Sequence, residues 1–241
     1  MIGAAKMMNV ATFHGTDDQT FNSSTTWSKP VGFPSSAAVT IEVWGAGGSG
    51  KAGFYYHAAF EGGGGGGGYT VLDTTLGALT STVSVTIGAG GLAVTYAVPT
   101  SNAGGSSSFG AYAVSGGGGA AIFDVNYPND CAGGVGGSGT YVGGAGGYAF
   151  ARSPYGTTTG ESVSYAGGGG GACGIISGSN VATAGGTSDN GGGAGGAASL
   201  GANGTTGTVP GGGGGAAWAG YTGHHYSGAG AAGRIRVRVV A

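Results

Sequence analysis

This chain has little charge, few prolines and no long apolar run, and each shortage excludes a class of protein. Only 7% of its 241 residues are charged, and a net charge of −2 with a pI near 6.0 offers no electrostatic basis for binding nucleic acid. No apolar run approaches the roughly 20 residues of a membrane span, so no membrane insertion is expected. Six prolines and no Gly-X-Y period exclude collagen. No 3.6-residue apolar period is sustained over about ten residues, so almost no α-helix is expected.

Cysteine is equally scarce. Cys131 and Cys173 stand alone, without CxxC or zinc-ligand spacing. This favours buried free thiols, and it leaves a disulfide between the two open. The first eight residues lack the uninterrupted apolar core of a secretory signal, so we expect the chain to be made and folded in a cytoplasm.

Glycine is what the chain has in abundance, with 64 residues that lie almost entirely between Gly45 and Gly233. Runs such as Gly62–Gly68, Gly167–Gly171 and Gly211–Gly215 do not suit α-helix or ordinary strand, because glycine loses the most backbone entropy on ordering. They are either disordered or packed as extended helices with three residues per turn, as glycine permits in collagen. Disordered chains are poor in apolar residues and rich in charge, whereas 40% of this chain is hydrophobic, which favours order.

Several segments alternate apolar and polar residues as strands do. The C-terminal strand is expected to complete a sheet begun near the N-terminus, where Glu42 would face one of its arginines. The expected strands are Thr20–Pro30 with an internal turn, Val39–Trp44, Tyr69–Asp73, Thr82–Ile87, the weaker pair Ser106–Phe109 and Ala111–Val114, and Arg234–Val239.

These features predict an all-β fold: an antiparallel, jelly-roll-like β-sandwich that carries polyglycine-II-type segments. Backbone N–H and C=O groups would pair between neighbouring glycine helices, because buried ones must find partners. We divide the chain into an N-terminal docking segment, residues 1–20, and a glycine-rich β domain, residues 21–241. The docking candidates are Met7, Met8, Val10 and Phe13.

Motifs that would indicate an enzyme or a cofactor are weak. Gly45–Ala52 has the GxxxxGK spacing of a phosphate-binding loop, but Ala52 stands where that motif needs Ser or Thr, and no helical pattern follows. There is no GxSxG, and the few carboxylates form no recognisable glycosidase pair. We expect a non-enzymatic protein with no cofactor; a polysaccharide depolymerase is the less favoured alternative.

Two loops rich in tyrosine and histidine are the candidate contact surface, because tyrosine is large, rigid and amphipathic. The alternative, that these side chains are buried caps of the glycine bundle, stays open. The adjacent His224 and His225 would point to opposite faces of a strand, so we expect no metal; a site shared by three chains is the alternative. The candidates are Phe54, Tyr55, Tyr56 and His57 in the first loop, and Tyr221, His224, His225 and Tyr226 in the second.

The order of the motifs resembles the glycine-rich domain of tailed-bacteriophage fibre and other virion surface proteins, from Phe21 to the C-terminus. The most specific pieces are the EVWGAGG run that begins at Glu42, the VTIGAGG run that begins at Val85, and GGSSSFG from Gly104. The resemblance implies a rigid frame of glycine helices, with the intervening loops as the recognition surface. It also implies a homotrimer whose partners are other virion proteins (fibre, tail or capsid) and a bacterial surface receptor.

We therefore expect a bacteriophage virion structural protein, namely a fibre, spike or head-decoration component, made in the host cytoplasm and displayed on the virion surface for host attachment. An extracellular glycine-rich structural or surface-binding protein is the alternative. It is disfavoured because no secretory signal is apparent, and the regular threonine array of an ice-binding face is missing.

Overall fold

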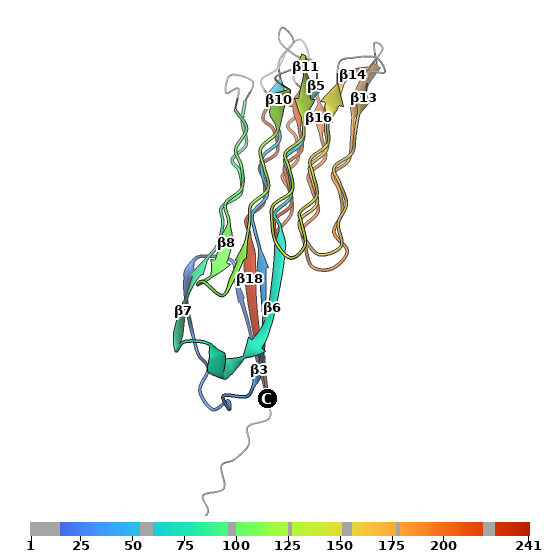
Figure 1. The fold of residues 1–241 in the computed structure, drawn as a ribbon. Helices are drawn as coiled ribbons and strands as arrows, with labels where there is room; N and C mark the ends of the chain where they lie inside the picture. Colours follow the sequence, from blue (N-terminus) through green and yellow to red (C-terminus); the bar gives the residue numbers. More distant parts are fainter. Residues whose placement is uncertain are drawn as a thin grey trace, which may run out of the picture.

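The computed structural model describes residues 15–53, 60–95, 100–124, 127–150, 156–176, 179–218 and 225–241. This part of the chain is all-β, as predicted: it contains one short 3-10 turn, η1 (Leu76–Ala78), and no α-helix. A base of twisted sheets carries a bundle of slender, extended segments (Figure 1). We call the end of the bundle farthest from the C-terminus the distal end.

Two four-stranded sheets form the base. The first, sheet A, is antiparallel throughout. Its C-terminal strand, Arg234–Val240, lies between the N-terminal strands β1 (Thr16–Phe21) and β3 (Ala38–Trp44). The prediction that the C-terminal strand completes a sheet begun near the N-terminus is therefore confirmed. The strands expected around residues 69–73 and 82–87 both form but belong to different sheets. Sheet A has the order β1 (Thr16–Phe21), β18 (Arg234–Val240), β3 (Ala38–Trp44) and β6 (Tyr69–Thr75); the second has β2 (Thr25–Ser28), β7 (Thr82–Thr86), β8 (Ser107–Phe109) and β9 (Ala113–Ser115).

The side-chain core lies between these two sheets. Because side chains alternate between the two faces of a strand, one face of each strand points into the core. Burying each large apolar side chain there contributes about 1.5–3 kcal/mol. Trp27 meets Phe109 edge to face at a centroid distance of 5.4 Å. The other large members are Val39, Ile41, Val43, Leu76, Leu79, Val83, Val85, Ile235, Val237 and Val239.

The chain enters the fold at the base. Thr16 pairs with Val240, and the expected boundary between residues 20 and 21 falls within β1. The docking candidates Met7, Met8, Val10 and Phe13 lie outside the described residues.

Each glycine segment repeats its hydrogen bonds every three residues, with partners on neighbouring segments. This pattern is that of a helix with three residues per turn and no internal hydrogen bonds, as the polyglycine II prediction requires. In 62–68 the N–H groups of Gly63 and Gly66 donate to Gly147 and Gly144, those of Gly64 and Gly67 to Gly214 and Gly211, and those of Gly65 and Gly68 to Gly119 and Gly116, all at 2.7–3.0 Å.

Four segments, 45–51, 62–68, 167–171 and 211–217, form the interior of the bundle. Every residue in them is buried, and each segment is hydrogen-bonded to six neighbours. The remaining segments close a ring around these four, and they follow one another around it in sequence order. The ring consists of 88–91, 102–105, 116–121, 133–138, 143–148, 158–161, 183–186, 193–198, 204–208 and 226–232.

A segment's place in the bundle matches its sequence. In the ring, every third position faces solvent and accepts a side chain: Val135, which follows Gly133 and Gly134, is 72% exposed. In the interior no position faces solvent, and a Cβ at Gly66 would overlap the carbonyl oxygen of Gly167. The longest unbroken glycine runs, 62–68, 167–171 and 211–215, therefore occupy the interior. Segment 45–51 is interior as well and carries the small buried side chains of Ala46 and Ser49, whereas most ring segments are interrupted at every third residue.

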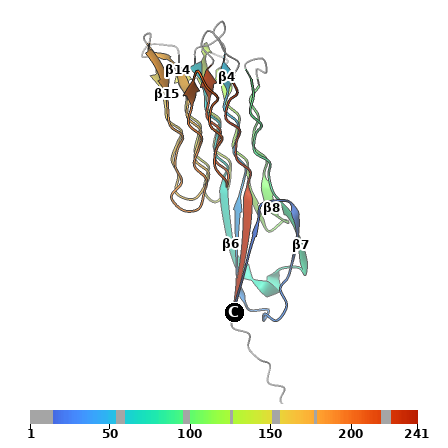
Figure 2. The same ribbon diagram turned by 180° about the vertical axis from the view of Figure 1, so that it is seen from behind.

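Short strands continue the glycine segments at the distal end (Figures 1 and 2). Most have only two to four residues, which is too short for the sequence pattern to reveal. They are β4 (Ala52–Gly53), β5 (Phe60–Glu61), β10 (Ile122–Asp124), β11 (Tyr127–Ala132), β12 (Ala149–Phe150), β13 (Gly156–Thr157), β14 (Cys173–Ile176), β15 (Ser179–Ala182), β16 (Ser199–Leu200) and β17 (Ala217–Trp218).

We predict that Gly66→Ala prevents the bundle from forming or destabilises the protein by more than about 3 kcal/mol, because backbone atoms on a neighbouring segment cannot yield the space of a Cβ. Urea unfolding and resistance to protease measure the effect. Val135→Ala, on a ring segment, is the control and should unfold like wild type. A Gly66→Ala protein as stable as the control would show that the interior is not close-packed.

We also predict that Trp27→Ala destabilises the base by about 3–5 kcal/mol, because it leaves a cavity against Phe109. The 93% exposed Val31 supplies the control Val31→Ala, which should change the free energy of unfolding by less than about 0.5 kcal/mol. Similar effects from the two substitutions would argue against a closed core between the sheets.

Candidate functional site at the distal end

The two predicted contact loops leave the described fold from neighbouring strands. Trp218 on β17 pairs with Gly53 on β4 in a parallel sheet, and these residues precede stretches 219–224 and 54–59. The two stretches therefore start side by side at the distal end. Six candidates in them, Phe54, Tyr55, Tyr56, His57, Tyr221 and His224, lie outside the described residues.

The other two candidates, His225 and Tyr226, are described and lie at the same end. Tyr226 is 51% exposed, and its backbone is held by a bridge to Thr95 and by an N–H donated to Asn203 Oδ1 at 2.9 Å. His225 is half-buried. A fixed backbone with an exposed ring makes Tyr226 available to a partner without an ordering cost for its main chain.

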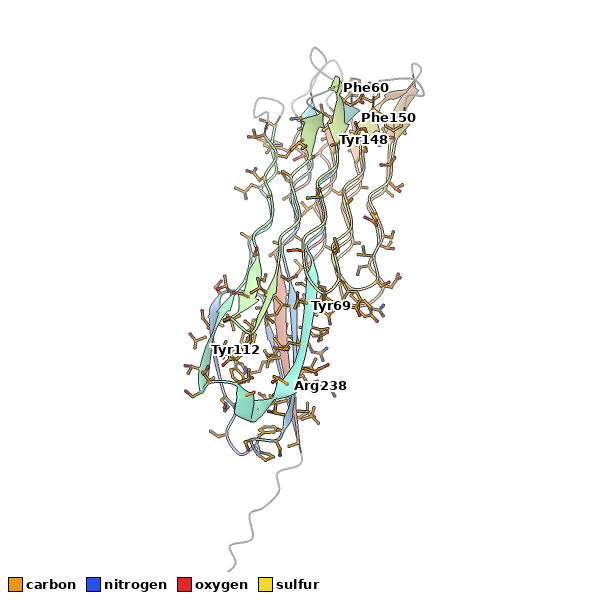
Figure 3. All side chains as sticks on the ribbon, viewed as in Figure 1. Phe60, Tyr69, Tyr112, Tyr148, Phe150 and Arg238 are labelled. Carbon is orange, nitrogen blue, oxygen red and sulfur yellow. The ribbon has the colours of Figure 1, made fainter. Side chains whose placement is uncertain are left out.

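Apolar side chains on the distal strands close this end of the bundle. Phe60 packs with Ala149 and Ala172, and Trp218 packs with Cys173 and Leu200. Figure 3 shows Phe60, Tyr148 and Phe150 together at this end. Large side chains are present where the glycine segments end, and they shield the last hydrogen bonds of the bundle from water.

A buried polar cluster lies under this cap and was not predicted. Lys51 and Glu61 are 1–2% exposed, and Cys131 and Cys173 are completely buried. The neighbouring Asp130, 1% exposed, accepts a hydrogen bond from the Tyr148 hydroxyl. Cys173 pairs with Glu61 across β14 and β5. Both cysteines are free thiols, so that prediction is confirmed. The one signal available in the sequence is that Lys51 and Glu61 directly flank two interior glycine runs.

Burial dominates the electrostatics of the cluster. It raises the pKa of Glu61 to about 8, because a carboxylate loses its hydration there; the charge of Lys51 opposes this rise. Burial, and next the charge of Glu61, raises the pKa of both Cys131 and Cys173, so these thiols are protonated and unreactive at neutral pH. Glu61 Oε2 has no hydrogen-bond partner among the described residues.

The structure bears on the possible phosphate-binding loop, on metal binding and on membrane spans. Gly45–Lys51 is an interior glycine segment with its lysine side chain buried, which is not the strand–loop–helix arrangement of a phosphate-binding loop. Among the described residues no group of three or more His, Cys, Asp or Glu side chains is placed to hold a metal ion. None of the described helices is long and apolar enough to cross a membrane.

The fold defines a class: a polyglycine-type bundle built onto a two-sheet base. The sequence matches the glycine-rich domain family over residues 19–240, and the chain belongs to this family. A comparison with curated protein sequences gives no significant match.

The raised pKa of Glu61 predicts a pH-dependent stability. The folded protein binds this proton more tightly than the unfolded chain, so the free energy of unfolding should fall as pH rises from about 4.5 to about 8 and then level off. Glu61→Gln should flatten this slope, measured by urea unfolding at several pH values. Glu161→Gln, which makes the same substitution at an exposed glutamate of a ring segment, is the matched control. An equal slope in wild type and Glu61→Gln would contradict the assignment.

Proposed function

We propose that this chain is a structural protein of a bacteriophage virion, displayed on the particle surface as a fibre, spike or head-decoration component that attaches the particle to its host. Its role is binding, not catalysis. The observation that carries the proposal is that the expected docking segment and the tyrosine-rich loops leave the fold at opposite ends. Residues 1–14 precede β1 at the base, whereas Gly53 and Trp218 lie on neighbouring distal strands.

The bundle suits this role mechanically. Its interior segments are cross-linked in six directions by backbone hydrogen bonds, so the distal end is held at a fixed distance from the base (Figure 1). Few charges and an interior of hydrogen-bonded backbone leave little for a protease or a change of salt to act upon. Such a frame keeps binding loops extended from a particle surface.

The order of motifs that resembles phage virion surface proteins also supports the proposal. It adds a homotrimer, with other virion proteins bound near the base and a bacterial surface receptor bound at the distal loops. Light scattering on the purified protein measures the trimer directly.

We predict that replacing Tyr55, Tyr56 and Tyr221 together by Ser abolishes binding of the purified protein to host cells, because the large amphipathic rings of the contact surface are lost. Flow cytometry with labelled protein measures binding. Tyr112→Ser, at the base, is the control and should bind host cells like wild type (Figure 3). The melting temperature of each variant is measured in parallel. Unfolding of the triple variant with a stable control would assign the three rings to the core.

Immunogold electron microscopy of purified particles tests the location. Gold on the tail would assign the protein to adsorption fibres or spikes, and gold on the head to capsid decoration. Particles without gold, from a phage shown to express the chain, would overturn the proposal.

A further inference from the structure

A second candidate site lies on the outer face of sheet A, far from the distal loops. Alternate residues of its strands turn away from the core, and the register aligns Arg234 with Trp44 and Arg236 with Glu42. The turn that ends at Gly191 lies against the Trp44 ring, where a Cβ on Gly191 would be 3.6 Å from Cζ2. An open, shallow pocket of about 440 Å³ lies here, lined by Asp18, Thr20, Trp44, Gly191, Arg234 and Arg236.

The two arginines in this pocket are not equivalent. All three guanidinium nitrogens of Arg236 already have partners in the protein. Its Nε donates to Asp18 Oδ1 at 2.9 Å, its Nη2 to Asp18 Oδ2, and its Nη1 lies 3.6 Å from Glu42 Oε2. Arg234 uses only Nε, which donates to Asn22 Oδ1 at 3.1 Å. Its two terminal nitrogens have no hydrogen-bond partner in the described part of the chain.

These groups together fit one ligand chemistry. A guanidinium with two free terminal nitrogens pairs in a bidentate manner with a carboxylate. The Trp44 indole is 5% exposed and packs against the Tyr69 ring at a centroid distance of 4.8 Å, so it contributes only a small apolar edge to the pocket. Thr20 and the carboxylate of Asp18 accept hydrogen bonds from hydroxyl groups. The Arg236 hydrogen bond lowers the pKa of Asp18, so this acceptor stays ionised.

We propose that this pocket binds a carboxylated sugar, with the sugar carboxylate on Arg234, hydroxyl groups on Asp18 and Thr20, and the edge of the ring beside Trp44. The volume lies within the range of about 300–1,000 Å³ usual for small-molecule sites. Arg236 with Asp18 and Glu42 carries a net charge of −1, and Arg234 brings these four side chains to zero. The ligand carboxylate would therefore be held by its bidentate hydrogen bonds to Arg234 and not by an excess of positive charge. The glycine at position 191, with φ of 86°, keeps the roof of the pocket free of a side chain.

This inference rests on the proposed function, because acidic sugars are constituents of bacterial surface polysaccharides. It assigns the protein a second contact with the cell surface, on the flank of the base. A fibre that binds a receptor with its distal loops and a repeating polysaccharide with its base gains avidity from the two attachments.

The test is calorimetric titration of the full-length protein with trigalacturonic acid and with its methyl ester, at low salt. Wild type should bind the acid at least about tenfold more tightly than the ester, and Arg234→Gln should lose at least about tenfold in affinity for the acid. Arg238→Gln is the matched control: Arg238 is exposed on the same face of the same strand but does not line the pocket. It should stay within about twofold of wild type.

Three results would overturn the inference: no binding by wild type, equal affinity for acid and ester, or equal losses in Arg234→Gln and Arg238→Gln. Melting temperatures show whether each variant is folded, and Arg234→Lys adds a variant that keeps the charge but not the planar fork. The outcome is separable from the proposed function. A protein found on virions that ignores trigalacturonic acid refutes only this site, and a protein that binds the acid through Arg234 but is absent from virions refutes only the virion role.

Discussion

The close approach of one backbone to another, with a hydrogen bond in place of a side-chain contact, is the constraint on which this structure depends. In the four interior segments, the N–H and C=O groups of three successive residues form hydrogen bonds with six different segments. Six neighbours therefore surround each interior segment. At the interior glycines, the spacing that makes these bonds leaves no volume for a Cβ. Glycine loses more entropy on folding than any other residue, and each hydrogen bond contributes only about 0.5–1.5 kcal/mol net. Order in the bundle is therefore collective, and no single segment is stable without its neighbours.

This construction divides the protein into two kinds of interior. The base has an ordinary apolar core between two sheets, with Trp27 and Phe109 at its centre. The bundle has a core of peptide groups. Sheet A connects the two, because β3, β6 and β18 run directly into the interior segments 45–51 and 62–68 and the ring segment 226–232. The register of the base strands thus determines the register of the glycine helices above them.

The functional consequences follow from where side chains are permitted. The interior of the bundle accepts only glycine and a few small side chains such as those of Ala46 and Ser49, the ring accepts side chains at the positions that face solvent, and larger side chains occur at both ends. At the distal end they form an apolar cap over a buried group of charged residues and thiols, and the tyrosine-rich stretches begin beyond it. At the junction with the base, the turn that ends at Gly191 reaches over sheet A and makes a pocket with Arg234 and Trp44.

The sequence by itself determined the all-β class, the main strands of the base, the return of the C-terminal strand and the helical state of the glycine runs. These follow from local physics: alternation with a period of two needs one buried face, and a run without side chains can be ordered only by its backbone. Only the tertiary structure decided which runs are interior, that the ring follows the sequence order, and that Lys51, Glu61, Cys131 and Cys173 lie together at the distal end. It also decided that Arg234 keeps two nitrogens free while Arg236 is bound to Asp18. Such facts depend on contacts between residues up to 218 positions apart, and no local pattern encodes a separation of that kind.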